Sequence, residues 1–172
     1  MRKSIACLFL ASIFLLGCRE TPKERISRDY FSGADTSNYY PGHLIIADTI
    51  TYDVIVKNPV PEDEWMKKSL EDLERNELID YLFESVYTGD LIAYDVFSGD
   101  ELSIREVEEI EKNPDFSRDK IGKIQFTERW FFKPTDLSLK KEVLAMVLGY
   151  ETYDEDGLVW GYKPVFKIYL NR

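Results

Sequence analysis

The stretch from Lys120 to Leu170 constrains the fold most, because apolar and polar residues alternate along it in three successive runs. Period-two alternation with aromatic and β-branched residues is typical of β-strands. The middle run, residues 141–150, is apolar on both faces between residues 143 and 148, which indicates a central strand. Turn-forming residues separate the runs at 133–138 and 154–157. We therefore predict an antiparallel three-stranded meander.

A further strand is predicted from Leu44 to Val56, well before the meander. Its apolar stripe is interrupted at Asp48, so we expect a β-bulge or a two-part strand there. Prolines at residues 58–61 end the run, because proline cannot donate to a strand ladder. His43 comes just before this strand, and we expect it to be exposed to solvent.

Residues 61–86 carry apolar side chains at helical spacing. Pro61 and the three acids that follow it suit the first turn of a helix. Asn76 can divide the stretch into two helices, and Gly89 is a natural C-cap. The side chains expected to face the core are Trp65, Leu70, Leu73, Leu78, Leu82 and Val86.

A short strand is predicted at Leu91–Val96, followed by a helix that extends to about Lys112. Ser103 and Glu106 have the spacing of a capping box at its start. Its inward residues are expected to be Ile104, Val107 and Ile110. Strands in sequence with helices inserted in one stretch predict an α+β fold, in which two or three helices pack on one face of a mostly antiparallel sheet.

Composition narrows the possible functions. The 172 residues are 44% hydrophobic, which is enough for a packed core, and the net charge is −10. That charge argues against nucleic-acid binding, which requires a basic surface. Cys7 and Cys18 are the two cysteines, and His43 is the one histidine, so multi-histidine or cysteine metal sites are excluded from the predicted domain.

The first 17 residues resemble a lipoprotein signal peptide. Arg2 and Lys3 precede an apolar run from Ile5 to Leu16, which is too short to span a membrane as a helix. The run ends in Leu-Leu-Gly followed by Cys18, which resembles a bacterial lipobox. The resemblance implies cleavage before Cys18 and its acylation, which attaches the chain to the lipid membrane. An ordinary secretory leader with a chance cysteine is the alternative.

Residues 18–42 are polar, and we interpret them as a tether between the membrane and a single domain at residues 43–172. Four aromatic residues interrupt the tether. They can pack back on the domain, or they can become ordered on a partner. These aromatic residues are Tyr30, Phe31, Tyr39 and Tyr40.

Glu128 is the acid that most resembles a catalytic group, because the alternation places it on an apolar strand face. Glycoside hydrolysis requires two carboxylates, and a second one is not evident in the sequence pattern. Pairing with Lys141, Lys163 or Lys167, or a role as an edge charge, is the plainer interpretation. We therefore expect no enzyme activity, no metal and no cofactor.

Two features of the last hairpin are candidates for binding a ligand or a partner. The acidic run at residues 154–156 could bind calcium loosely, although it lacks the ligand spacing of an EF-hand, so a hairpin turn is the preferred interpretation. Trp160 and Tyr162 are the aromatic pair expected to be exposed, and they form the candidate interaction surface.

Several short motifs together resemble the GldN/PorN-like family of gliding-motility and type IX secretion proteins. They are Trp65–Lys68, Leu82–Phe83, Gly89–Tyr94, Glu128–Phe132 and Gly161–Phe166. The resemblance implies a non-enzymatic component of the secretion and gliding machinery, with protein partners in a ring at the periplasmic face of the outer membrane. In that family the ring partner is a lipoprotein, known as GldK or PorK.

This chain departs from the family pattern in two places. Cys18 would give it a lipid of its own, whereas GldN itself is usually secreted without one. It also lacks an insert of the family between Trp65 and Leu82. The alternative function is a ligand-binding or glycan-binding lipoprotein of the cell envelope that uses Trp160 and Tyr162.

Overall fold

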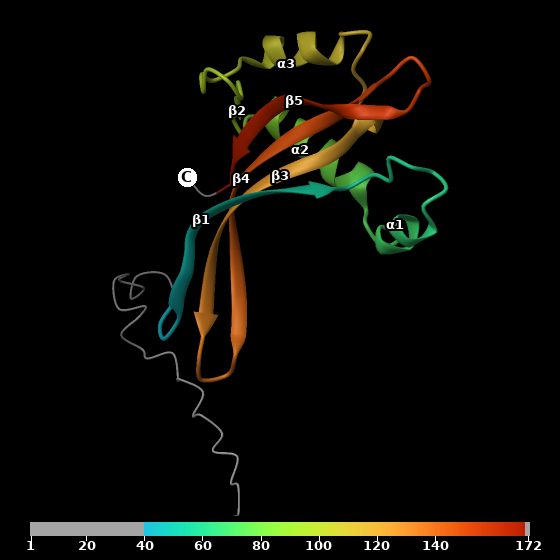
Figure 1. The fold of residues 1–172 in the computed structure, drawn as a ribbon. Coiled ribbons are helices and arrows are strands. Elements are labelled where there is room, and N and C mark those ends of the chain that lie inside the picture. The colour runs from blue at the N-terminus through green and yellow to red at the C-terminus, as the bar shows by residue number, and fades with distance from the viewer. Residues whose placement is uncertain (1–39, 171–172) are drawn as a thin grey trace, which may run out of the picture.

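The computed structural model describes residues 40–170. Within them, five strands form one antiparallel sheet in the order β1-β3-β4-β5-β2 (Figure 1). The elements are β1 (Leu44–Ile55), α1 (Glu64–Ser69), α2 (Arg75–Thr88), β2 (Ala93–Tyr94), α3 (Ile104–Glu111), β3 (Ile121–Lys133), β4 (Ser138–Tyr153) and β5 (Val159–Tyr169). The predicted α+β fold is confirmed, and so is the meander of β3, β4 and β5.

The central position of β4 is also confirmed, because β3 and β5 flank it. Successive residues of β4 lie on opposite faces of the sheet. The Leu148 side chain therefore enters the core, while Val147 and Gly149 belong to the other face. The register between β3 and β4 shifts between Thr127 and Glu128. This bulge separates the sheet body from the outer part of the hairpin.

The hydrophobic core lies between the sheet and α2, and α3 adds Val107 to it. Phe83 of α2 and Phe166 of β5 are both fully buried, with ring centroids 5.0 Å apart in an edge-to-face arrangement. α2 ends at Gly89, whose φ of 82° is the left-handed conformation expected for its predicted C-cap. The predicted capping box of Ser103 and Glu106 is present at the start of α3.

Three side chains predicted to face inward are exposed instead. Trp65 is 75% exposed because α1 buries no residue, and Leu73 lies in the connection between the two helices. The predicted break comes earlier than Asn76, and Glu74 takes the N-cap position without a side-chain hydrogen bond. Ile104 is the first residue of α3, and it is 47% exposed.

β1 has the predicted irregularity at Asp48, where its register with β3 shifts on either side of Ala47. The prediction that His43 is exposed is wrong, since it is 7% exposed. Tyr40 covers it, with ring centroids 5.5 Å apart, and Tyr40 also packs edge-on against the fully buried Phe131 at 4.8 Å. Tyr40 therefore packs back on the domain, and the other tether aromatics lie outside the described residues.

The outer part of the sheet projects away from the helices (Figure 1). We call this projection the arm. It consists of the first half of β1 (residues 44–50) and the outer β3–β4 hairpin (residues 128–143). Leu44 pairs with Phe132, so the chain enters the sheet close to the tip of the arm.

Candidate functional site

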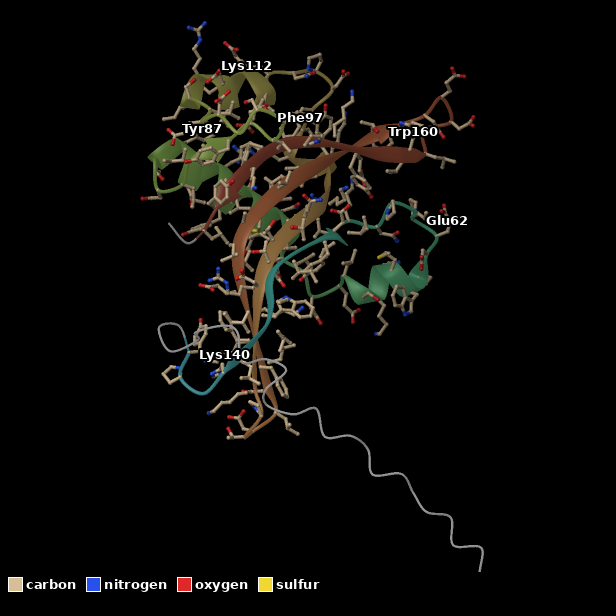
Figure 2. The ribbon with its side chains drawn as sticks, turned by 60° about the vertical axis from the view of Figure 1, so that its left-hand side comes forward. Glu62, Tyr87, Phe97, Lys112, Lys140 and Trp160 are labelled. Atoms are coloured by element: carbon tan, nitrogen blue, oxygen red, sulfur yellow. The ribbon has the colours of Figure 1, made fainter. Side chains whose placement is uncertain are left out.

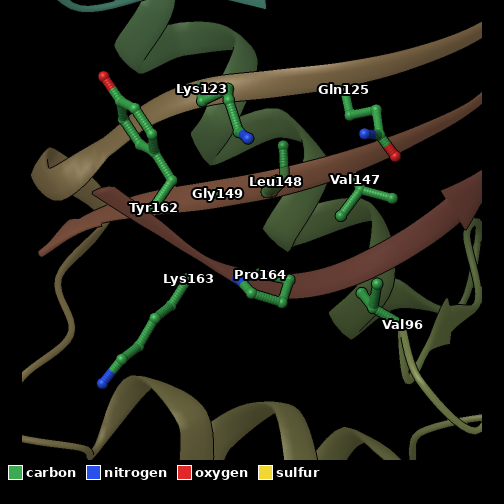
Figure 3. Close-up of a pocket in the computed structure, with 9 residues that line it drawn as sticks. All are labelled: Val96, Lys123, Gln125, Val147, Leu148, Gly149, Tyr162, Lys163 and Pro164. Carbon is green, nitrogen blue, oxygen red and sulfur yellow. The ribbon is translucent and has the colours of Figure 1, made fainter. Parts of the chain in front are cut away.

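The sheet face opposite α2 has a shallow hollow of about 130 Å³ (Figure 3). Lys123, Gln125 and Val147 line it, and they alternate along their strands with the core residues Ile124 and Leu148. Cavities that enclose small molecules usually measure about 300–1,000 Å³. This mixed polar and apolar hollow is therefore suited to contact with a surface or a single side chain.

Tyr162 forms one wall of the hollow, and it is half-buried rather than exposed. The Lys123 ammonium lies 5.4 Å from the centre of its ring, within the range of a cation–π contact. Burial raises the pKa of the Tyr162 phenol, and the negative charge of Glu151 raises it further. The ring is thus held against the sheet and remains protonated at neutral pH.

Beside Tyr162, a buried ion pair connects β4 to the segment after β1. Glu151 is 2% exposed, and its Oε2 accepts hydrogen bonds from Lys57 Nζ at 2.5 Å and from the Tyr153 hydroxyl at 2.6 Å. The hydrogen bond to Glu151, together with burial, raises the pKa of Tyr153 to about 12. Glu151 Oε1 has no hydrogen-bond partner. This pair holds a carboxylate beside Tyr162, at the edge of the hollow.

Glu151 was not predicted as a site residue from the sequence, although Gly122 indicated that another side chain approaches its strand closely. A Cβ atom on Gly122 would lie 2.9 Å from Glu151 Oε1 and 3.0 Å from the Tyr162 ring. A glycine inside a predicted strand often marks such a close approach. The residue that approaches comes from a neighbouring strand, however, and a single sequence does not specify which one it is.

The two aromatic residues of the candidate interaction surface have different environments. Trp160 is 79% exposed, as expected, whereas Tyr162 is only partly accessible. The register between β4 and β5 shifts between Thr152 and Tyr153, opposite Trp160. This bulge takes Trp160 out of regular alternation with Tyr162. Their role as an interaction surface stays a prediction.

Glu128 is buried, and structural partners surround it. Trp130 Nε1 donates to its Oε2 at 2.8 Å, and Lys141 Nζ lies 3.9 Å from the same oxygen. The Lys141 ammonium also lies 4.3 Å from the centre of a Trp130 ring. Of the three lysines considered from the sequence, Lys141 is therefore the partner. Burial raises the pKa of Tyr52 beside this group, with a further contribution from Glu128.

The acidic run after β4 forms the preferred hairpin turn. Asp154 Oδ1 accepts hydrogen bonds from the backbone N–H groups of Asp156 and Leu158, and Gly157 takes a positive φ of 79°. Within residues 40–170, no group of three or more histidine, cysteine, aspartate or glutamate residues has the geometry to hold a metal ion.

The predicted lipidation site, Cys18, lies outside the described residues. Among the helices of residues 40–170, none is long and apolar enough to cross a membrane. Neither a protein-family model nor a curated protein matches this chain.

Proposed function

We propose that this chain is a non-enzymatic lipoprotein, held in the cell envelope by acylated Cys18, whose domain works by contacting other proteins. The observation that carries the proposal is the apolar leader that ends in Leu-Leu-Gly and Cys18. Several acyl chains on one residue anchor a protein stably, whereas a single chain gives only reversible binding. The expected location is the periplasmic face of the outer membrane.

The state of the buried acids supports a role without catalysis. Glu128 is held by Trp130 and Lys141, and Glu151 is held by Lys57 and Tyr153. A catalytic acid or base must reach a substrate proton, either directly or through one water molecule. Glu128 Oε2 and Glu151 Oε2 are instead directed to neighbouring side chains, as in structural ion pairs.

We further propose that the partners belong to the gliding-motility or type IX secretion machinery. The support is the resemblance to the GldN/PorN-like family, several of whose motif residues occupy structural positions in this domain, whereas Trp65 is exposed. Trp130 is hydrogen-bonded to Glu128, Phe83 and Phe166 meet in the core, and Gly89 caps α2.

Lipidation and partnership can be tested in the native cell. Metabolic labelling with a fatty acid should mark the full chain, and Cys18→Ser should remove the label and release the protein from membranes. Purification from wild-type membranes should recover secretion-ring components together with the chain. A chain that is recovered alone, in cells whose secretion is normal after deletion of its gene, would contradict the secretion role.

A glycan-binding function is the second candidate, and the observation that favours it is the 79% exposure of Trp160. Exposed aromatic rings stack on sugar faces. Trp65 provides a matched control, because it is 75% exposed on α1 and lies outside the hairpin. Binding to a glycan array that is lost in Trp160→Ala and kept in Trp65→Ala would support this function, and an array without signal would reject it.

A further inference from the structure

The tip of the arm exposes apolar side chains. Leu137 is 75% exposed in the turn between β3 and β4, and Leu139, two residues later, is 49% exposed. Pro134 at the start of the same turn is exposed too. All of them lie at the end of the hairpin farthest from the helices (Figure 1). The domain therefore has a small exposed apolar patch at one end.

The backbone at Leu137 is unusual. Its φ is +56°, and among the described residues it is the one non-glycine residue with a positive φ. The other positive values belong to Gly42, Gly89, Gly99 and Gly157. A leucine is disfavoured in this conformation, and little packing compensates for it when three quarters of the residue is exposed. A residue whose side chain is unfavourable in its backbone conformation indicates that the side chain makes a contact outside the domain.

The charge of the tip is opposite in sign to that of the chain. Residues 133–141 hold three lysines and one aspartate, a balance of +2, whereas the whole chain has a net charge of −10. Lys133 pairs with Asp136 at 3.1 Å and Lys141 lies 3.9 Å from Glu128, so Lys140 is the tip lysine that makes no ion pair with a carboxylate among the described residues. Lysines beside exposed leucines form the pattern that binds the interface of an anionic membrane.

The tether joins the domain at this same end. Tyr40, the first described residue, has its ring 4.8 Å from Phe131 and 4.7 Å from the Lys140 ammonium. Cys18 and Tyr40 are separated by 22 peptide units, which can span at most about 75 Å. An anchor at Cys18 therefore keeps the end of the domain that carries the tip within about 75 Å of the bilayer.

We propose that the tip of the arm inserts Leu137 and Leu139 into the interface of the membrane that holds Cys18, with Lys140 contacting anionic headgroups. This inference rests on the lipid anchor of the proposed function, and it adds a second point of contact. Contact at the tip places the helices at the end of the domain that is farther from the lipid (Figure 1). Each lysine near an anionic surface contributes about fivefold to binding.

Spin labelling can measure the depth of the tip directly, because the described residues contain no cysteine. The full chain, acylated in cells and carrying Leu137→Cys with a nitroxide, is placed in vesicles of phosphatidylethanolamine and phosphatidylglycerol. The control is Phe97→Cys, because Phe97 is 86% exposed at the opposite end of the molecule from Lys140 (Figure 2). The unsubstituted chain, labelled in the same way, gives the background.

We expect the label at position 137 to be more accessible to oxygen than to a water-soluble nickel complex, and the label at position 97 to show the reverse. Replacement of phosphatidylglycerol by a neutral lipid should shift the label at position 137 toward water. Equal access to the nickel complex at both positions, in protein that floats with the vesicles, would overturn the inference and leave the anchor intact. Protein that does not float would overturn the anchor itself.

Leu137→Asn separates membrane contact from folding, because asparagine tolerates a positive φ. A nitroxide on Thr135→Cys, in the same turn, should move from the lipid toward water when Leu137→Asn is added. The urea midpoint of the variant should be equal to or higher than that of the parent. The inference would be contradicted if the label at residue 135 lost lipid contact only together with a fall in the urea midpoint of the variant.

Discussion

At the scale of single residues, the clearest feature is the ion pair of Lys57 and Glu151. Its two members differ in burial, because the Glu151 side chain is 2% exposed and that of Lys57 is 33% exposed. A buried charge that loses its partner is costly, whereas a charge that water can reach is not. The two halves of the pair should therefore respond differently to substitution.

Lys57→Met should lower the free energy of unfolding by about 3 kcal/mol, because the buried Glu151 carboxylate loses its cationic partner and keeps the hydrogen bond from Tyr153. Glu151→Gln should cost only about 1 kcal/mol, because water can hydrate the ammonium that remains. Urea denaturation of the two variants measures the difference. Equal losses, or a larger loss for Glu151→Gln, would contradict this account of the pair.

Alkaline pH should weaken the fold through two tyrosines. The pKa of Tyr153 is raised to about 12 by its hydrogen bond to Glu151 and by burial, and burial together with a hydrogen bond to Glu111 raises that of Tyr87 to about 12. The ordinary value is 10, so the folded chain retains these protons after the unfolded chain has lost them. Their stabilisation is complete below pH 10 and is lost as the pH rises toward 12.

The measurement is the urea midpoint as a function of pH from 9 to 12. The midpoint should fall with pH in the parent chain, and the fall should be smaller in the double variant Tyr87→Phe and Tyr153→Phe. Lysines titrate in the same range, so the difference between the two proteins is the quantity of interest. Identical curves would contradict the assignment.

At the scale of elements, α3 depends on its cap. It has eight residues and buries only Val107 fully, so its own packing is limited. Ser103 accepts a hydrogen bond from the Glu106 backbone N–H, and Glu106 accepts one from the backbone N–H of Ser103. A helix this short is marginal without such contacts.

Ser103→Ala should lower stability by about 1 kcal/mol and increase hydrogen exchange in α3. Ser117→Ala is the matched control, because Ser117 precedes a 3₁₀ turn and makes no side-chain capping bond there. It should change stability by less than about 0.5 kcal/mol. If the two substitutions have the same effect, the capping box does not stabilise α3.

At the scale of the whole molecule, one core connects the helices to the sheet. Phe83 of α2 is fully buried against Phe116 and Phe166, and Arg118 lies over its ring at 4.4 Å. Arg118 also bonds Glu111 of α3 and Asp80 of α2, so it connects both helices at the start of β3. A cavity at Phe83 should therefore destabilise the whole domain.

Phe83→Ala should lower the free energy of unfolding by about 3–5 kcal/mol, a large part of the total stability of a domain of this size. Tyr81→Ala, two residues earlier on α2, is the control, because Tyr81 is 71% exposed. Its effect should be within about 0.5 kcal/mol. A large loss in Tyr81→Ala would show that another surface packs on this helix.

The amino-acid sequence alone predicted the features that depend on neighbouring residues. Alternation over residues 121–170 predicted the meander, the interruption at Asp48 predicted the bulge in β1, and Ser103 with Glu106 predicted the cap of α3. Each of these depends on backbone geometry or on hydrogen bonds over a few residues. Such local signals are present in any chain that contains the motif.

Only the tertiary structure decided which faces are covered and which charges meet. Trp65 is exposed, and His43 is buried under Tyr40, because helical or strand spacing defines a face but not the element that packs on it. The Lys57–Glu151 pair joins residues that are 94 positions apart. The physical reason is that burial and pairing depend on contacts between distant segments, and those contacts form only when the whole sheet assembles.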